Sequence, residues 1–489
     1  MTTDILALES GYDTPALHAE GLFIGGRWES GTGILVDNPS TGETLAEVAD
    51  ASVDDALRAV DAAAAAATEW RSTPARQRAE ILRRWFELMS DHAEELARLI
   101  SLENGKALPD ARGEVAYAAE FFRWYAEEAV RIAGEFRHTP SGAHRILVDH
   151  EPIGIALLIT PWNFPAAMAT RKIGPALAAG CTVILKPAAE TPLTAFALAR
   201  LGAEAGVPPG VVNVLSTSRP ADITNAILAD PRVRKLSFTG STAVGRRLLA
   251  EAAKRVISCS MELGGNAPFI VFDDADLDNA LDGAMIAKMR NAGEACTAAN
   301  RFYVQSGIHD EFVAGLTQRM GELKVGPGIE TGVQVGPMIT SAAVQKIDGL
   351  VQRAVAQGAR IHTGGQSLPG AGNFYLPTVM DNVPLDAEIA KAEIFGPVAC
   401  VYRFESEQDA IAAANDTEYG LAAYVYSEDL ARAMRVSKQL ESGMVAINRG
   451  LMSDPAAPFG GVKQSGIGRE GGVTGILEFL EPKYYALSL

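Results

Sequence analysis

The sequence predicts an α/β protein with two open α/β units and a pair of strands outside both. Short apolar runs alternate with helical segments from Pro152 onward, and such alternation is typical of parallel sheets covered by helices. The chain has 489 residues, whereas single hydrophobic cores stop growing at about 250–300 residues. Residues 138–150 and 476–489 alternate in strand fashion outside both series. We therefore expect two sheets and a separate arm.

The elements before Pro152 are predicted to be mainly helical. Residues 53–70 are rich in alanine, and residues 75–104 place apolar side chains at helical spacing. In the first α/β unit, strands are expected at residues 153–160, 181–185, 211–215 and 233–238, with helices at 192–205 and from about 242. In the second unit, strands are expected at residues 269–272 and 301–305, with helices through about 290 and to about 323.

The junction between the two units is expected near Glu262. The first domain would then comprise residues 1–130 and 151–262, and the second residues 263–455. Residues 131–150 and 470–489 would form the arm, whose two strands we expect to pair. An edge so far from either core is expected to be covered by another subunit, so we expect a homodimer or homotetramer.

The charge and the cysteines exclude several classes of protein. Lys and Arg number 43 against 60 Asp and Glu, a net charge of −17, which disfavours nucleic acid and anionic membranes as partners. The N-terminus lacks a signal peptide's positive charge and apolar run, and no apolar run reaches the ~18 residues of a membrane span, so a cytoplasmic protein is expected. The four cysteines form no CxxC and have no suitably spaced His, so neither a metal site nor disulfides are expected.

Cys296 is the candidate nucleophile among the four cysteines. It lies in a turn of small residues between a predicted helix and a predicted strand, where a side chain stays accessible. Cys181, Cys259 and Cys400 fall in predicted strands and are interpreted as small hydrophobic residues. Because no His lies in the nearby segments, a carboxylate is the alternative base.

Three further motifs could surround this thiol, although each has an equally simple structural interpretation. Glu262 precedes two glycines at the domain junction, and would otherwise be a surface acid. Asn163, between two prolines, could donate to an oxyanion or cap a helix. Gly240 and Gly245 flank a strand-to-helix turn, which could bind a pyrophosphate or be an ordinary junction.

Seven motifs together resemble the aldehyde dehydrogenase superfamily over essentially the whole chain, in the family's order and spacing. They are Pro161-Trp-Asn-Phe-Pro165, Lys186-Pro, Phe238-Thr-Gly-Ser241, Glu262-Leu-Gly-Gly265, Gly293-x-x-Cys296, Glu393-Ile-Phe-Gly-Pro397 and Pro458-Phe-Gly-Gly461. The resemblance implies an aldehyde dehydrogenase-like fold: two Rossmann-like α/β domains, one for the cofactor and one for catalysis, plus a β-strand oligomerisation arm. The first domain above would bind the cofactor, and the second would be catalytic.

The resemblance also implies roles for residues at the matching positions. The Cys296 thiolate would attack an aldehyde, with the Asn163 side chain and the Cys296 N–H holding the oxyanion. Hydride would pass to NAD or NADP, and Glu262 would activate the water that releases the acid. The implied cofactor-binding residues are Thr160, Pro161, Trp162, Lys186, Ala188, Ala189, Gly240, Ser241, Gly245, Leu263, Glu393 and Phe395.

Within the superfamily the likeness is greatest to the succinate-semialdehyde dehydrogenases. Arg171, Arg290 and Ser453 match the residues that hold the distal carboxylate of the substrate in that subfamily, and a bidentate arginine suits a carboxylate. Phe164 and Phe459 are also implied to contact the substrate. Either arginine could instead pair with a structural acid, and glutarate semialdehyde would satisfy the same arginines.

Three positions depart from the pattern of many relatives. Ala189 stands where an acid would bind the adenosine ribose, and Glu190 follows one residue late; loss of the acid favours NADP use. Ala298 replaces a second cysteine, so no disulfide switch is expected. Glu294 replaces a glutamine, and it would raise the pKa of the Cys296 thiol if it pointed inward, or else point to solvent.

Three other functions compete with this interpretation. A cysteine hydrolase or thioesterase would not need Gly240, Lys186 or Glu393. A CoA-acylating aldehyde dehydrogenase would typically lack the acid at Glu262. A non-catalytic protein with this fold would not be expected to keep Cys296, Glu262 and Asn163 together.

Overall fold

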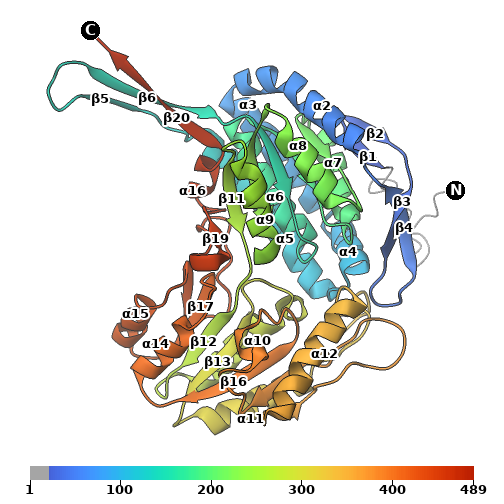
Figure 1. Ribbon diagram of the computed structural model, residues 1–489, viewed down its shortest axis with the longest axis vertical. Coiled ribbons are helices and arrows are strands. Elements are labelled where there is room, and N and C mark those ends of the chain that lie inside the picture. The colour runs from blue at the N-terminus through green and yellow to red at the C-terminus, as the bar shows by residue number, and fades with distance from the viewer. Residues whose placement is uncertain (1–20, 489) are drawn as a thin grey trace.

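The structure is a computed structural model that describes residues 21–488. The chain forms two lobes, each built on one large sheet, and a thin arm of strands that projects from the upper lobe (Figure 1). The predicted α/β class with two open sheets and outlying strands is therefore confirmed. The first 20 residues of the predicted first domain, the N-terminal segment interpreted above, and Leu489 of the predicted arm lie outside the described residues.

The sheet of the upper lobe has eight strands, of which the central five are parallel. Its order is β19 (Gly466–Ile467), β11 (Ser258–Glu262), β10 (Val233–Thr239), β7 (Ile155–Ile159), β8 (Thr182–Lys186), β9 (Val212–Val214), β1 (Leu22–Ile24) and β2 (Arg27–Glu29). Strands β7 and β8 are buried along their whole length, as expected for parallel strands with helices on both faces. The expected strands of the first unit are all present.

The helices of the upper lobe include three for which the sequence analysis gave no range. They are α2 (Val53–Ser72), α3 (Ala75–Asp91), α4 (Ala93–Asn104), α5 (Leu108–Ala129), α6 (Pro165–Ala179), α7 (Pro192–Glu204), α8 (Pro220–Ala229) and α9 (Thr242–Ala253). The predicted helix 75–104 is divided at His92, whose φ and ψ are −100° and 21°. No range was predicted for α5, α6 or α8, and β1, β2 and the hairpin of β3 (Gly33–Asp37) and β4 (Thr44–Ala49) were not predicted. Strands β1 and β2 have three residues each, which is too short for a period to appear.

The sheet of the lower lobe has seven strands and is parallel except at β14. Its order is β14 (Arg360–Thr363), β15 (Thr378–Asp381), β16 (Val398–Phe404), β13 (Ala299–Gln305), β12 (Ala267–Val271), β17 (Ala422–Tyr426) and β18 (Met444–Ile447). Its helices are α10 (Leu277–Met289), α11 (His309–Gly321), α12 (Ser341–Ala356), α13 (Glu388–Lys391), α14 (Glu407–Asn415) and α15 (Leu430–Ser437). The chain enters this sheet directly after β11, which ends at Glu262.

The arm is a three-stranded antiparallel sheet. Strand β20 (Leu480–Leu487) pairs with β6 (Arg145–Pro152), which in turn pairs with β5 (Glu135–His138), so the predicted pairing of the two outlying segments is confirmed. The strand starts ten residues after the predicted start of this segment at residue 470. Helix α16 (Thr474–Leu477) and Phe479 precede it, and Ile476 and Phe479 are buried in the core of the upper lobe.

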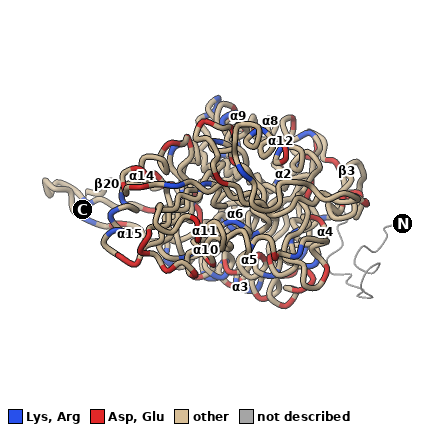
Figure 2. Tube along the Cα trace, turned by 90° about the horizontal axis from the view of Figure 1, so that it is seen from below, with Lys and Arg blue, Asp and Glu red and all other residues tan. Residues whose placement is uncertain are grey.

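The surface carries both signs of charge. Basic and acidic residues are interleaved along the trace (Figure 2). Within residues 21–488, no helix combines the length and the hydropathy needed to span a membrane. No group of three or more His, Cys, Asp or Glu side chains in that range is placed to hold a metal ion.

Candidate active site

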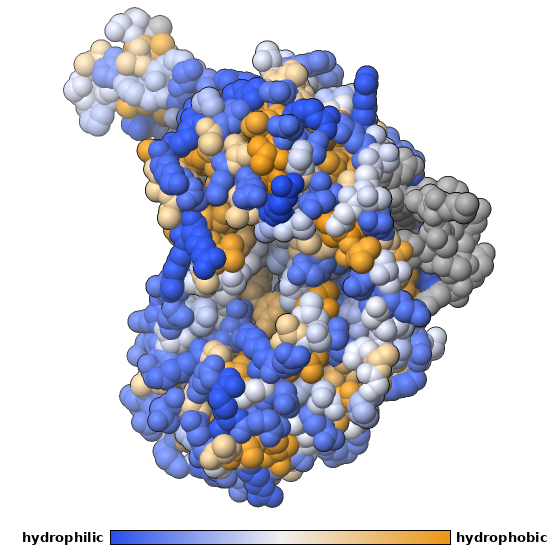
Figure 3. All heavy atoms as spheres, turned by 45° about the vertical axis from the view of Figure 1, so that its right-hand side comes forward, coloured by the Kyte–Doolittle hydropathy of each residue, from blue (hydrophilic) through white to orange (hydrophobic). Residues whose placement is uncertain are grey.

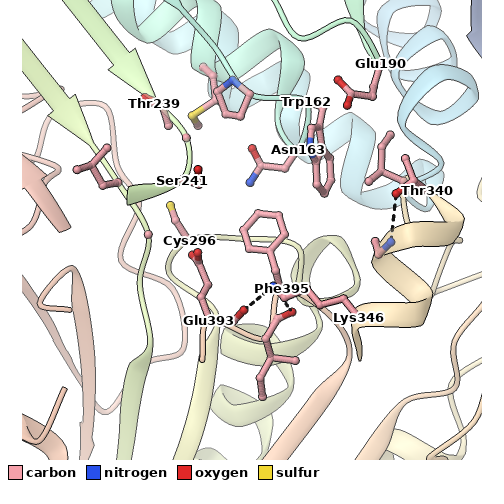
Figure 4. A pocket seen from close by; sticks show the side chains of 18 residues that line it. Trp162, Asn163, Glu190, Thr239, Ser241, Cys296, Thr340, Lys346, Glu393 and Phe395 are labelled. Atoms are coloured by element: carbon pink, nitrogen blue, oxygen red, sulfur yellow. Dashed lines mark hydrogen bonds between the residues drawn. The ribbon is translucent and has the colours of Figure 1, made fainter. Parts of the chain in front are cut away.

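A cavity of about 320 Å³ lies where the loops after the strands of the upper lobe meet the lower lobe. Figure 3 shows the face of the molecule that is hollowed between the lobes, and Figure 4 shows the cavity from close by. The lining residues are Pro161, Trp162, Asn163, Met168, Glu190, Thr239, Gly240, Ser241, Leu263, Gly264, Cys296, Ile339, Thr340, Ala343, Lys346, Glu393, Ile394 and Phe395.

Residues from several distant motifs meet at this cavity, as the sequence predicted. They are Pro161, Trp162, Asn163, Gly240, Ser241, Leu263, Cys296, Glu393 and Phe395. The other predicted site residues do not line it; these are Thr160, Lys186, Ala188, Ala189, Gly245, Glu262, Arg171, Arg290, Ser453, Phe164 and Phe459. The sequence analysis did not assign Met168, Thr239, Gly264 or the residues of α12 to the site. Thr239 and Gly264 lie within two of the quoted motifs, whereas Met168 and the residues of α12 lie outside all of them, so only the folded chain reveals the latter.

Cys296 is held by a tight turn between α10 and β13. Asn291 and Ala292 have φ of 51° and 52°, and Gly293 follows with φ of 79°, so the turn runs through three left-handed residues. Left-handed conformations are costly for residues with a Cβ and tend to persist at functional sites. A Cβ on Gly265 would lie 2.2 Å from the carbonyl oxygen of Cys296, so only glycine fits beside Cys296.

Burial raises the pKa of the Cys296 thiol to about 12, and the positive charge of Arg171 only partly opposes this. The protein without cofactor therefore holds a thiol rather than a thiolate at neutral pH. We expect alkylation of Cys296 by iodoacetamide to accelerate by about tenfold per pH unit between pH 7 and 10, because the thiolate reacts. Peptide mapping of the alkylated protein measures this rate at Cys296 alone. A rate that levels off below pH 8 would contradict the expectation.

The side-chain amide of Asn163 has a fixed orientation. Its Nδ2 donates to the carbonyl oxygen of Glu294 over 2.9 Å, which leaves the second amide hydrogen free. The backbone carbonyl oxygen of Asn163 accepts from Lys106 Nζ at 2.7 Å and from Asn291 Nδ2 at 2.9 Å. In Figure 4 the amide lies above Phe395 and across the cavity from Cys296. One hydrogen is thus available for an oxyanion beside the thiol.

A buried ion pair that the sequence analysis missed supports this asparagine. Lys106 Nζ binds the carboxylate of Glu114 in α5, and both side chains are fully buried. Glu114 Oε1 also accepts from the backbone N–H groups of Ala166 and Ala167 at 2.9 and 3.2 Å. The pair therefore holds the loop of Asn163 and the start of α6 together. In the sequence, an acid in an amphipathic helix is usually a solvated residue, so no local signal distinguishes Glu114.

Glu262 ends β11 with only 2% of its surface exposed. Its Oε2 is buried and has no hydrogen-bond partner. Burial raises the pKa of this carboxyl well above its usual range, and the negative charge of Glu470 raises it further. A carboxylate with a raised pKa is a stronger base at neutral pH, so Glu262 has the character that a general base needs.

The remaining residues around the cavity fit a dinucleotide. Helix α9 begins at the cavity with Ser241 as its N-cap, and a helix start suits a pyrophosphate. A Cβ on Gly245 would lie 2.4 Å from the side chain of Leu263, so this helix packs closely on the chain after β11. Glu393 accepts from the N–H of Gly265 at 2.9 Å, and burial raises the pKa of its carboxyl to about 7. Its other oxygen remains for a ribose hydroxyl.

Lys186 and two aromatic rings complete this side of the site. Lys186 ends β8, and its Nζ donates to the carbonyl oxygen of Pro187 at 2.9 Å. Burial lowers the pKa of this ammonium group to about 8. Trp162 and Phe395 meet edge to face with their ring centroids 5.4 Å apart. The lysine keeps two donors for hydroxyl groups, and the rings form an apolar wall.

The two arginines predicted to bind a carboxylate differ from each other. Arg171 forms an ion pair with Glu470, which also pairs with Lys172, and it lies over the ring of Phe459 at 4.2 Å. Arg290 lies over the ring of Phe164 at 4.8 Å, and its Nη1 donates to Ser453 Oγ at 3.5 Å. Among the described residues, Arg290 makes no ion pair.

Glu294 points inward, which decides between the two orientations left open by the sequence. Only 1% of its surface is exposed, and Oε1 accepts from the N–H of Ile339 at 3.2 Å. Burial raises the pKa of its carboxyl to about 8. At neutral pH this side chain is therefore mostly uncharged, and it does not place a full negative charge behind the thiol.

The comparison with known families settles the membership of the chain. The sequence model described as "Aldehyde dehydrogenase family" matches residues 28–485. The chain belongs to the aldehyde dehydrogenase family. The resemblance inferred from the seven motifs is therefore confirmed.

Three similar proteins indicate where in this family the chain lies. Succinate-semialdehyde dehydrogenase of Paenarthrobacter nicotinovorans is 55% identical over 444 residues, 91% of this chain and 99% of that protein. Glutarate-semialdehyde dehydrogenase of Pseudomonas aeruginosa is 49% identical over 474 residues, 96% of this chain and 98% of that protein. The crystal structure of an Escherichia coli NADP dependent enzyme matches with a TM-score of 0.96 and 49% identity, covering 98% of this chain and 100% of that one.

Proposed function

We propose that this aldehyde dehydrogenase oxidises succinate semialdehyde, or a similar aldehyde with a distal carboxylate, to the acid with NADP or NAD. The observation that carries the proposal is Arg290, a cation without an acid partner among the described residues. It lies against Phe164, the neighbour in sequence of Asn163, and beside Ser453. Glutarate semialdehyde is the second candidate, because a relative of nearly the same identity is named for it.

The proposed chemistry uses three side chains of the cavity region. Cys296 Sγ, once deprotonated, attacks the aldehyde carbon, and the free amide hydrogen of Asn163 and the N–H of Cys296 stabilise the oxyanion. A bound nicotinamide supplies the hydride acceptor. Glu262 then takes a proton from the water that attacks the resulting thioester, and the acid leaves with regeneration of the thiol. The raised pKa of Glu262 supports this role.

We propose that the dinucleotide lies across the upper lobe. Lys186, with Thr160, Ala188 and Ala189 after the neighbouring strands β7 and β8, would bind the adenosine part. Gly240, Ser241 and Gly245 at the start of α9 would bind the pyrophosphate. Glu393, Phe395, Trp162, Pro161 and Leu263 would surround the nicotinamide end. Residues 1–130 and 151–262 would thus be the cofactor domain, and residues 263–455 the catalytic domain.

We expect NADP to be used at least as well as NAD. Ala189 places no carboxylate where one would repel a 2′-phosphate, and Glu190 lines the cavity one residue later. The ratio of kcat/KM values for the two cofactors measures this preference. The variant Ala189→Glu should lower kcat/KM for NADP by about tenfold or more and leave NAD use nearly unchanged. A preference of the natural chain for NAD of about a hundredfold would contradict this prediction.

The arm supports the proposal of a homodimer or homotetramer. Strands β5 and β20 form the two edges of the arm and pair with no further strand of residues 21–488, and Phe136 on β5 and Tyr484 on β20 are 60% and 55% exposed. Such an edge is normally covered.

Four free cysteines, one of them the proposed nucleophile, suit the reducing cytoplasm.

The experiment that tests the function is reduction of NAD and NADP with paired aldehydes. Succinate semialdehyde, glutarate semialdehyde and butanal differ in the presence and distance of the carboxylate. We expect kcat/KM for succinate semialdehyde to exceed that for butanal by about a hundredfold, because the charge-assisted contact to Arg290 is lost in butanal. Equal kcat/KM values for succinate semialdehyde and butanal would contradict the proposed function. A higher kcat/KM for glutarate semialdehyde than for succinate semialdehyde would make glutarate semialdehyde the proposed substrate.

A further inference from the structure

Tyr117 lies on α5 and was not assigned to the site by its sequence. Its hydroxyl oxygen is buried and makes no hydrogen bond of full geometry, although the side chain of Arg171 lies close enough to interact with it. Its ring is held in place by Phe121, one turn further along α5, at 4.9 Å between centroids in an edge-to-face contact. The phenol can still donate its own hydrogen, and no acceptor for this hydrogen lies among the described residues.

The surroundings of this hydroxyl are cationic. The guanidinium carbon of Arg290 lies 5.7 Å from the ring centroid of Tyr117. Burial raises the pKa of Tyr117, and the charges of Arg171 and Arg290 partly oppose this rise. The phenol is therefore neutral over the physiological range, and it can donate its proton in a hydrogen bond.

We propose that Tyr117 is a specificity-determining residue whose hydroxyl donates a hydrogen bond to the distal carboxylate of the substrate, beside the guanidinium group of Arg290. This inference rests on the proposed function and adds a residue to it. The carboxylate would lie between Arg290, Tyr117 and Ser453. It would accept the hydroxyl hydrogen of Tyr117.

The charges around Tyr117 favour a single carboxylate rather than a larger anion. Arg171 shares the carboxylate of Glu470 with Lys172, so it already has an acidic partner. Of the two arginines that act on Tyr117, Arg290 is the one that makes no ion pair with a described residue. Ser453 accepts from Arg290, so its own hydroxyl hydrogen is available to an anion. One positive charge and two hydroxyl donors match a monoanion with two acceptor oxygens.

The substitution Tyr117→Phe removes the hydroxyl and keeps the ring. We expect kcat/KM for succinate semialdehyde to fall by about tenfold or more, mainly through KM, because a hydrogen bond to a charged group is lost. The value for butanal should stay within about twofold, since butanal has no carboxylate to bind. The melting temperature should stay the same or rise, because an unsatisfied buried hydroxyl is removed.

Tyr402→Phe is the matched control. Tyr402 lies in β16 of the lower lobe, and its hydroxyl is also buried without a hydrogen-bond partner. This variant makes the same chemical change elsewhere, so it should leave the preference for succinate semialdehyde over butanal unchanged. A loss of the preference in this control as well would contradict the specific role of Tyr117.

The outcomes separate this inference from the proposed function. If the natural chain does not prefer succinate semialdehyde over butanal, the proposed function fails. If the natural chain prefers it and Tyr117→Phe keeps the full preference, the role of Tyr117 is wrong while the proposed function stands. An equal loss with both aldehydes, together with a lower melting temperature, would show that Tyr117 is structural and would also overturn the inference.

Discussion

Replacement of Cys296 by Ala is expected to lower kcat for aldehyde oxidation by at least about 10⁴-fold. No other thiol can replace it, because Cys181 and Cys400 are buried in the cores of the two lobes and Cys259 lies in β11. Steady-state reduction of NADP with succinate semialdehyde measures the loss. Binding of the cofactor, followed by quenching of tryptophan fluorescence, should persist because Trp162 is unchanged.

Cys259→Ala is the matched control for this substitution. Cys259 is half-buried, and its Sγ interacts with the carbonyl oxygen of Ile257 rather than with the cavity. This variant should keep kcat within about twofold of the natural chain. Residual turnover of Cys296→Ala within about tenfold of the natural chain would show that the thiol is not the nucleophile.

Replacement of Glu262 by Gln is expected to separate the two halves of the reaction. Hydride transfer needs Cys296 and Asn163, so one equivalent of reduced cofactor should form in a burst. Release of the acid needs a base, so the steady-state rate should fall by about 10²–10⁴-fold. Stopped-flow absorbance of the reduced cofactor resolves the burst from the slow phase.

A partly exposed glutamate provides the control for this variant. Glu251 lies on α9 and pairs with Lys254 at the surface, so Glu251→Gln should leave both phases unchanged. A Glu262→Gln variant with no burst would place Glu262 before hydride transfer instead. Its raised pKa would then serve to deprotonate Cys296, whose own pKa is raised by burial.

The parts of the site that follow strands could be predicted from the sequence. Asn163 follows β7, Glu262 ends β11 and Gly240 follows β10, and parallel strands bring their carboxyl ends to one edge of a sheet. In each case the local sequence indicates the end of the strand, through glycines, prolines or the end of an apolar run. For this reason the cavity residues of those motifs were predicted together.

The partners of buried charges could not be predicted, because they come from distant parts of the chain. Lys172 and Glu470 are 298 residues apart in sequence and form a buried ion pair. Glu470 also forms an ion pair with Arg171. From the sequence alone, Arg171 could bind the carboxylate of the substrate or pair with a structural acid. Similarly, the sequence did not show whether Glu294 faces solvent or the interior. In the folded chain the side chain points inward and accepts from the N–H of Ile339. Local patterns do not specify which distant segment supplies a counterion.

In the proposed mechanism, Cys296 carries the acyl group after hydride transfer. Glu262→Gln mixed with succinate semialdehyde and NADP should accumulate this acyl-enzyme, because its hydrolysis is blocked. Acid quench, digestion and mass spectrometry of the peptides measure it. We expect one added acyl group on the peptide that contains Cys296, in an amount proportional to the amplitude of the burst. A full burst with no adduct on this peptide, or with the adduct on another residue, would contradict it.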